Sequence, residues 1–278
     1  MAQTFAQALT LTPDGDGGLI AQLTGDFSNA PAAMPQERGA PFGGLMAALA
    51  GKAACEGLGI ETPLKTLTVQ YLAAARFEAC AFTPRLSRGG RNVAYATVSG
   101  GQPDRPAIEA LATFGRDGNG PDLKPLPFSP RPWAEIEPTP LAGRYGPWFT
   151  QYIDYRFPDG PRLFGENAGE SPELGCWMRT ADAAPLDEAR LLFLLDGLYP
   201  TYWTALPAPP AISASVDLRA DLLTAIGPET SPEGWAYFHF TSRDVGGGWA
   251  VEDGVAWGPD GRPLALVRQR RKLMPTRS

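Results

Sequence analysis

The sequence predicts an α+β protein of two related halves, each with one long helix wrapped by a curved antiparallel β-sheet. Three observations predict it. Helix-like and strand-like segments occur twice in the same order, a proline-rich segment separates the two sets, and apolar residues are abundant enough for a sizeable core. Of 278 residues, 44% are hydrophobic and 19% are charged, as is typical of globular proteins. A sheet must curve around a long helix to bury its apolar sides.

The first half covers residues 1–116. Its helix is predicted at about Gly43–Glu56, where small residues such as Gly44 and Gly51 allow a sheet to approach closely. Strands are predicted on both sides of this helix from their apolar and β-branched residues. The predicted strands are Thr4–Leu11, Leu19–Thr24, Leu64–Leu72, Cys80–Ser87, Asn92–Ser99 and Ala107–Phe114.

The second half covers residues 147–278 and repeats this order. A helix is predicted at about Leu186–Trp203, because Pro185 and the acidic Asp187 and Glu188 are typical of a helix start. The predicted strands are Phe149–Phe157, Leu174–Arg179, Ile212–Leu218, Trp235–Ser242, Trp249–Trp257 and Leu264–Leu273.

A proline-rich linker, residues 117–146, separates the halves, since prolines at this density continue neither a helix nor a central strand. Two local matches indicate an internal duplication. The segment Ser87–Gly90 resembles the segment that begins at Ser242, and Arg105-Pro106 resembles Arg262-Pro263. Their offsets of 155 and 157 residues keep the halves nearly in register.

Composition excludes several kinds of partner. The net charge of −6 repels phosphate backbones, so nucleic acid is not expected. The most apolar stretches, Leu45–Ala54 and Leu191–Leu195, are far shorter than the ~20 residues that span a bilayer, and the N-terminus lacks a signal-peptide pattern. We therefore expect no membrane contact. Three widely spaced cysteines suggest neither disulfides nor zinc, which favours a cytoplasmic protein.

The sequence also excludes several kinds of chemistry. The single histidine, His239, lies in a predicted strand and is interpreted as a packed side chain rather than a catalyst. There is no G-x-S-x-G nucleophile motif, no phosphate-binding glycine loop and no metal-ligand cluster. No cofactor is predicted. Chemistry must therefore use carboxylates, hydroxyls, amides and backbone donors.

Asp196 is the carboxylate that stands out. It follows the apolar run Leu191–Leu195 and has helical spacing with Tyr199 and Trp203. A carboxylate on an apolar face loses solvation, which raises its pKa towards values useful for a general base. Alternatively, Asp196-Gly197 is the end of the helix.

Ser215 and Gln269 are polar residues on predicted strands. Ser215 shares a strand face with Asp217, which is typical of a solvated face, whereas Gln269 continues an apolar face after Val267. A site role and a strand end in water are both compatible with Gln269. The basic run Arg268–Lys272 is interpreted as a solvated edge rather than a coenzyme A phosphate site.

Several segments resemble acyl-CoA thioesterase II proteins. In the first half of this chain, the similar segments are Pro41–Gly44, Leu67–Leu72 and Glu109–Phe114. In the second half, they are Asp196, Ser213–Asp217 and Val267–Gln269. The resemblance implies a double hotdog that hydrolyses an acyl-CoA thioester. It also implies that Asp196, Ser215 and Gln269 together hold a water molecule, with Ser215 standing where the family has threonine.

These expectations combine into one mechanism. Asp196 takes a proton from the water, and backbone amides at Gly43 and Gly44 stabilise the charge on the substrate carbonyl. Tyr199 and its aromatic neighbours line an apolar substrate pocket. The first-half counterpart of Gln269 is Ala112, so we expect one reactive set per chain.

Other functions remain open from sequence. The alternative is a hotdog protein that binds an acyl or aromatic ligand without catalysis. A hotdog hydratase normally needs a catalytic histidine, for which His239 is poorly placed. A homodimer is also expected. The acyl chain, the physiological substrate and the effect of serine in place of threonine are not determined by the sequence.

Overall fold

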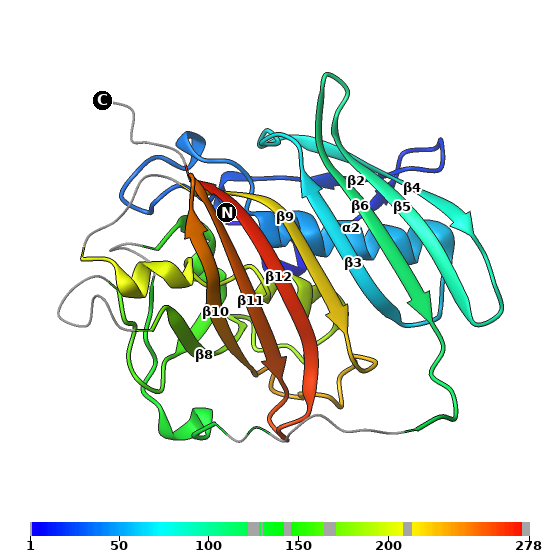
Figure 1. Ribbon diagram of the computed structural model, residues 1–278. Helices are drawn as coiled ribbons and strands as arrows, with labels where there is room; N and C mark the ends of the chain where they lie inside the picture. Colours follow the sequence, from blue (N-terminus) through cyan, green and yellow to red (C-terminus); the bar gives the residue numbers. More distant parts are fainter. Residues whose placement is uncertain are drawn as a thin grey trace.

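The sheet is built symmetrically about its centre. The computed structural model describes residues 2–121, 128, 130–141, 146–163, 171–207 and 213–273. Within these ranges, twelve antiparallel strands form one sheet in the order β1-β2-β4-β5-β6-β3-β9-β12-β11-β10-β8-β7 (Figure 1). The strands are β1 Thr12–Pro13, β2 Leu19–Gln22, β3 Leu64–Tyr71, β4 Ala79–Arg88, β5 Val93–Gln102, β6 Arg105–Gly115, β7 Ile153–Arg156, β8 Glu173–Thr180, β9 Ser213–Leu222, β10 Ala236–Gly246, β11 Trp249–Trp257 and β12 Pro263–Leu273.

The two halves meet where β3 pairs with β9. Moving outward from this junction, β6, β5, β4 and β2 on one side correspond to β12, β11, β10 and β8 on the other. The strand register matches as well, because Ala112 pairs with Leu67 and Gln269 pairs with Leu218. Ala112 and Gln269 are therefore equivalent positions, as the 157-residue offset predicts.

Helix α2 (Gly43–Leu58) forms the centre of the core. Ten of its sixteen residues are buried, between Gly44 and Ala54, as expected for a helix that is apolar on all sides. It contacts β2, β3, β4, β5 and β6 on one side and α3 (Glu188–Leu194) on the other. Figure 1 shows α2 crossing one face of the sheet. The helix ends at Gly59, whose φ of 59° is the left-handed conformation typical of this position.

The second helix is not long, and this prediction is wrong. Helix α3 has only seven residues, and the chain then turns through Asp196 and Gly197 into a 3₁₀ segment, Thr201–Ala205. Pro200 prevents one continuous helix from reaching Trp203, since a proline disfavours helical backbone at the residue before it, although α3 already ends at Leu194. The hydroxyl of Tyr155 holds the turn by donating to the Gly197 carbonyl at 2.8 Å.

Two predicted strands also differ. Residues Thr4–Leu11 contain a short helix, α1 (Phe5–Ala8), because the Thr4 hydroxyl and the Gln7 amide form a reciprocal capping box. Residues Phe149–Phe157 begin with a 3₁₀ segment, Trp148–Tyr152, before β7. The remaining predicted strands match β2 to β6 and β8 to β12 apart from their ends, and Ile212 lies outside the described residues.

Part of the predicted linker packs on the outer face of the second half. Trp133 stacks on Trp235 with ring centroids 5.3 Å apart, and Ile136 is buried with Trp177 and Tyr237 in a cluster separate from the main core. The division at residues 117–146 itself stays a prediction. In the described part of the chain, we find no helix long and apolar enough to cross a membrane.

Two glycines of α2 allow a matched stability test. A Cβ at Gly44 would lie 2.5 Å from the backbone oxygen of Phe193, whereas a Cβ at Gly51 would meet only the end of the Leu192 side chain, at 2.7 Å. We expect Gly44→Ala to lower the free energy of unfolding by about 1–3 kcal/mol, because backbone must move. Gly51→Ala should stay within about 1 kcal/mol of wild type, because alanine favours the helix. Urea unfolding measures both, and equal losses would contradict this packing.

Candidate active site

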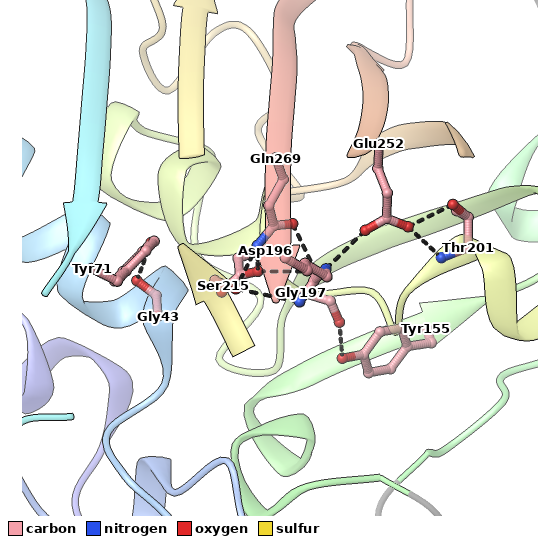
Figure 2. A network of polar contacts seen from close by, with 10 residues as sticks. Gly43, Tyr71, Tyr155, Asp196, Gly197, Thr201, Ser215, Glu252 and Gln269 are labelled. Atoms are coloured by element: carbon pink, nitrogen blue, oxygen red, sulfur yellow. Dashed lines mark hydrogen bonds and ion pairs between the residues drawn. The ribbon is translucent and has the colours of Figure 1, made fainter. Parts of the chain in front are cut away.

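Three polar residues that are far apart in the sequence meet in the structure. The Gln269 Nε2 atom on β12 donates to Asp196 Oδ1 at 2.6 Å and to Ser215 Oγ on β9 at 2.7 Å. Asp196 follows α3, and Figure 2 shows the three side chains pointing toward one another. Asp196 is only 6% exposed and Gln269 only 1%. The three side chains therefore converge at one buried place, and their roles in a reaction stay a prediction.

A β-bulge turns Ser215 inward. Simple alternation places Ser215 with Asp217, on the strand face opposite Leu218. In the structure Asp217 pairs with Arg270 and Ser215 with Arg271, so the register shifts by one residue. The extra residue of a bulge reverses the alternation beyond it. Ser215 consequently shares the inner face with Leu218, and the solvated face that the sequence suggested is wrong.

The start of α2 lies against the Asp196 carboxylate. A Cβ at Gly43 would be 2.7 Å from Asp196 Oδ2, so only glycine leaves the carboxylate in this position. The Tyr71 hydroxyl on β3 donates to the Gly43 carbonyl at 3.0 Å (Figure 2). Gly43 and Gly44, which the sequence singled out, are thus beside Asp196, and the first half of the chain contributes to the site.

Burial dominates the protonation of Asp196. Loss of solvation raises the pKa of its carboxyl above the ordinary value of 3.8, and the nearby charge of Glu252 raises it further. Arg271, the Gln269 amide and the Gly44 amide lower the pKa but do not cancel the effect of burial. The carboxylate is therefore a stronger base than an exposed aspartate.

Two further buried charges belong to the site. Arg271 Nε donates to Glu252 Oε2 at 2.8 Å, and Arg271 Nη2 donates to Gln269 Oε1 at 2.7 Å. Sequence reasoning missed both. A signal existed, since Arg271 continues the inward alternation Val267–Gln269 and Glu252 lies among the small inward residues of β11. The interpretation of Arg268–Lys272 as a solvated edge is wrong for Arg271, which is 8% exposed.

Tyr199 is placed differently from the other predicted site residues. Its ring is stacked between Phe157 and Trp203, with centroids 6.2 and 6.3 Å away. Within the described ranges, no hydrogen bond or ion pair joins Tyr199 to Asp196. Tyr199 therefore contacts aromatic rings rather than the Asp196 carboxylate, and its role in substrate binding stays a prediction.

His239 and the acidic residues near it lie apart from Asp196. Among the described residues, no three His, Cys, Asp or Glu side chains gather so that they could hold a metal ion. His239 lies next to Glu173, with Nε2 and Oε2 3.6 Å apart, and it shares the outer face of β10 with Tyr237 rather than the inner face that carries Phe238. The reactive groups at hand are a carboxylate, a hydroxyl, an amide and backbone N–H groups.

Comparison with known proteins identifies the family of this chain. Two family models match, one described as the acyl-CoA thioesterase N-terminal domain over residues 30–115, and one as the acyl-CoA thioesterase C-terminal domain over residues 121–270. Among curated proteins, the search finds no match. The likeness to solved structures is extensive, although sequence identity is low.

Three solved structures illustrate the likeness. A protein of unknown function with a hotdog fold from Alicyclobacillus acidocaldarius is 24% identical, with a TM-score of 0.83 and 98% of each chain covered. An acyl-CoA thioesterase II from Mycobacterium marinum is 19% identical, with a TM-score of 0.72 and the same coverage of both chains. The dehydratase domain of PpsC from Mycobacterium tuberculosis, in complex with C12:1-CoA, is 12% identical, with a TM-score of 0.54 over 98% of this chain and 100% of that one.

At these identities the solved structures show the fold alone, whereas the two family models cover most of both halves of the chain. The chain belongs to the acyl-CoA thioesterase family and is a thioester hydrolase with a hotdog fold.

Proposed function

We propose that this hydrolase cleaves acyl-CoA thioesters by direct attack of a water molecule, with Asp196 as the general base. The buried Asp196 carboxylate, hydrogen-bonded to Gln269 beside the first turn of α2, is the observation that carries the proposal. Water adds to the thioester carbonyl as its proton passes to Asp196. The C–S bond then breaks, and the proton passes to the leaving thiolate, which yields a carboxylic acid and the coenzyme A thiol.

The hydrogen bonds indicate a separate role for each of the three side chains. Both N–H groups of the Gln269 amide have acceptors, Asp196 and Ser215, so Gln269 orients these two residues. Ser215 Oγ accepts from Gln269 and, at 3.3 Å, from Arg271. Its own proton is then left to donate. We assign the nucleophilic water to the space beside Asp196 and the Ser215 hydroxyl.

The first turn of α2 suits the charge that develops on the carbonyl oxygen. Phe42, at the N-cap, gives no side-chain hydrogen bond to the first amides of the helix. The helix dipole favours negative charge at this end, where the Gly44 amide already faces the Asp196 carboxylate. Gly43 and Gly44 are proposed to bind the substrate carbonyl, and the stacked rings of Phe157, Tyr199 and Trp203 are proposed to face the acyl part.

Substitution of the base tests the proposal. We expect Asp196→Asn to reduce kcat by about 10²–10⁴-fold with a panel of acyl-CoA substrates, because the general base is lost. Ser215→Ala and Gln269→Ala should reduce it less, and Ser215→Thr should preserve it. Free coenzyme A thiol measures turnover. Asp217→Asn is the matched control on β9 and should be unchanged. Wild-type turnover by Asp196→Asn would refute the mechanism, and ligand-induced thermal shift without turnover would favour the non-catalytic binder.

The pH profile reports the same carboxylate. Only the ionised form of Asp196 accepts a proton, so kcat should fall on acidification with a midpoint above 3.8, since burial raises the pKa. Ser215→Ala should be slower at every pH but keep the midpoint. A rate that is constant down to pH 4 would contradict the assignment of Asp196 as the base.

Stability should depend on the same titration. The pKa of Asp196 is higher in the folded than in the unfolded chain. Titration of Asp196 therefore lowers the free energy of unfolding as pH rises from 3.8 through the folded-state pKa. Asp196→Asn is therefore expected to be more stable than wild type at pH 7, with a difference that shrinks towards pH 4. Thermal unfolding across this range measures it. A less stable variant at pH 7 would show that the ionised carboxylate stabilises the fold.

A further inference from the structure

The buried polar cluster extends beyond Asp196, Ser215 and Gln269. Arg271 contacts all three and also Glu252, and both Arg271 and Glu252 are buried, at 8% and 2% exposed. Glu252 in turn accepts from the Thr201 hydroxyl at 2.5 Å and from the Thr201 amide. The chain of contacts runs from Thr201 through Glu252 and Arg271 to the Gln269 amide. Figure 2 shows Thr201 beside Glu252, and Gln269 beside Asp196.

Arg271 determines which way the Gln269 amide faces. A guanidinium only donates, so the Gln269 atom that it meets at 2.7 Å must be the oxygen. The amide nitrogen is then turned to Asp196 and Ser215, where it donates twice. The reversed amide would place an oxygen against the Asp196 carboxylate and lose both donors.

Two carboxylates share this one guanidinium unequally. Arg271 is 2.8 Å from Glu252 Oε2 but 3.4 Å from Asp196 Oδ1. Glu252 has the two Thr201 donors as well. Glu252 therefore takes most of the positive charge, and Asp196 remains only partly compensated. Asp196 therefore has the longer of the two contacts with the guanidinium.

The first half of the chain shows that the fold does not need this cluster. The row Glu252–Gln269–Leu218 corresponds to Ala96–Ala112–Leu67. The cross-strand pair Arg271 and Ser215 corresponds to the pair Phe114 and Leu64. In each half, this pair directly follows a register shift between the two strands. The same sheet positions are thus filled by apolar side chains in one half. A buried charge network at a position where Phe114 packs well indicates a function other than folding.

We propose that Arg271, anchored by Glu252, is a positioning residue of the thioesterase site, which fixes the Gln269 amide and the neighbouring Asp196 carboxylate. This inference rests on the proposed function, because it assigns Arg271 to the same reaction. Arg271 acts through Gln269 and Asp196, so its loss should affect kcat more than KM.

The decisive variant removes both charges of the ion pair together, so that neither is left buried alone. For Glu252→Gln/Arg271→Gln we expect kcat to fall by about 10–100-fold, because the catalytic groups are displaced. The acid midpoint of kcat should rise, since Arg271 lowers the pKa of Asp196 more than Glu252 raises it. Tyr71 and Tyr155 also face Asp196, but their raised pKa values keep them neutral.

Arg271→Lys separates charge from geometry. Lysine keeps a positive charge but cannot form the fork that reaches Glu252 and Gln269 together. Its kcat should fall as well, while its acid midpoint stays closer to wild type than that of the double variant. Arg270→Gln is the control, because Arg270 is the exposed neighbour on the opposite strand face, and it should match wild type in both measurements.

The outcomes separate this inference from the proposed function. If Asp196→Asn is inactive but the double variant keeps wild-type kcat and midpoint, Arg271 has no positioning role. Should the double variant not fold, a wild-type kcat for Arg271→Lys overturns the proposal equally. If turnover is not detectable, the stability difference caused by Asp196→Asn is measured against pH, once in the wild-type protein and once in the double variant. The pH at which this difference appears should be higher in the double variant. The same pH in both proteins overturns the proposal.

Discussion

The hydrogen bond between Gln269 Nε2 and Asp196 Oδ1 is the interaction on which the site depends. At 2.6 Å it joins β12 to the turn after α3, and it does so where the carboxylate is almost completely buried. Burial of a charge is costly unless donors satisfy it. The donors come from β12 and from the start of α2, so the carboxylate is held by segments from both halves of the chain. Its basicity and its position therefore have one physical origin.

The two halves share a strand order but differ in the residues at their equivalent inward positions. Both halves place strands in the same order around the β3–β9 junction. In the first half the equivalent inward positions are Leu64, Ala96, Ala112 and Phe114, which pack against α2 as ordinary core. In the second half these positions are polar, and a turn that carries Asp196 follows the short helix α3. One half thus retains an apolar core while the other carries the polar cluster.

Much of the fold could be predicted from the sequence, and the reasons lie in particular segments. Period-2 alternation in Trp249–Trp257 and Leu264–Leu273 marks strands whatever their partners are. The division at the proline-rich residues 117–146 stays a prediction. The exceptions are local. The capping box of Thr4 and Gln7 forms a helix where a strand was expected. The second helix ends at Leu194, and Pro200 prevents it from continuing to Trp203.

The sequence by itself determined the order of elements, the duplication, and the three residues that converge, because these follow from periodicity and from a family resemblance. Only the tertiary structure decided the rest. The bulge that turns Ser215 inward depends on register with β12, and the burial of Arg271 depends on Glu252 in a neighbouring strand. Neither pairing is local in the chain, so no pattern within one segment specifies it. The environment of the carboxylate, and hence its chemistry, exists only after the two halves have packed together.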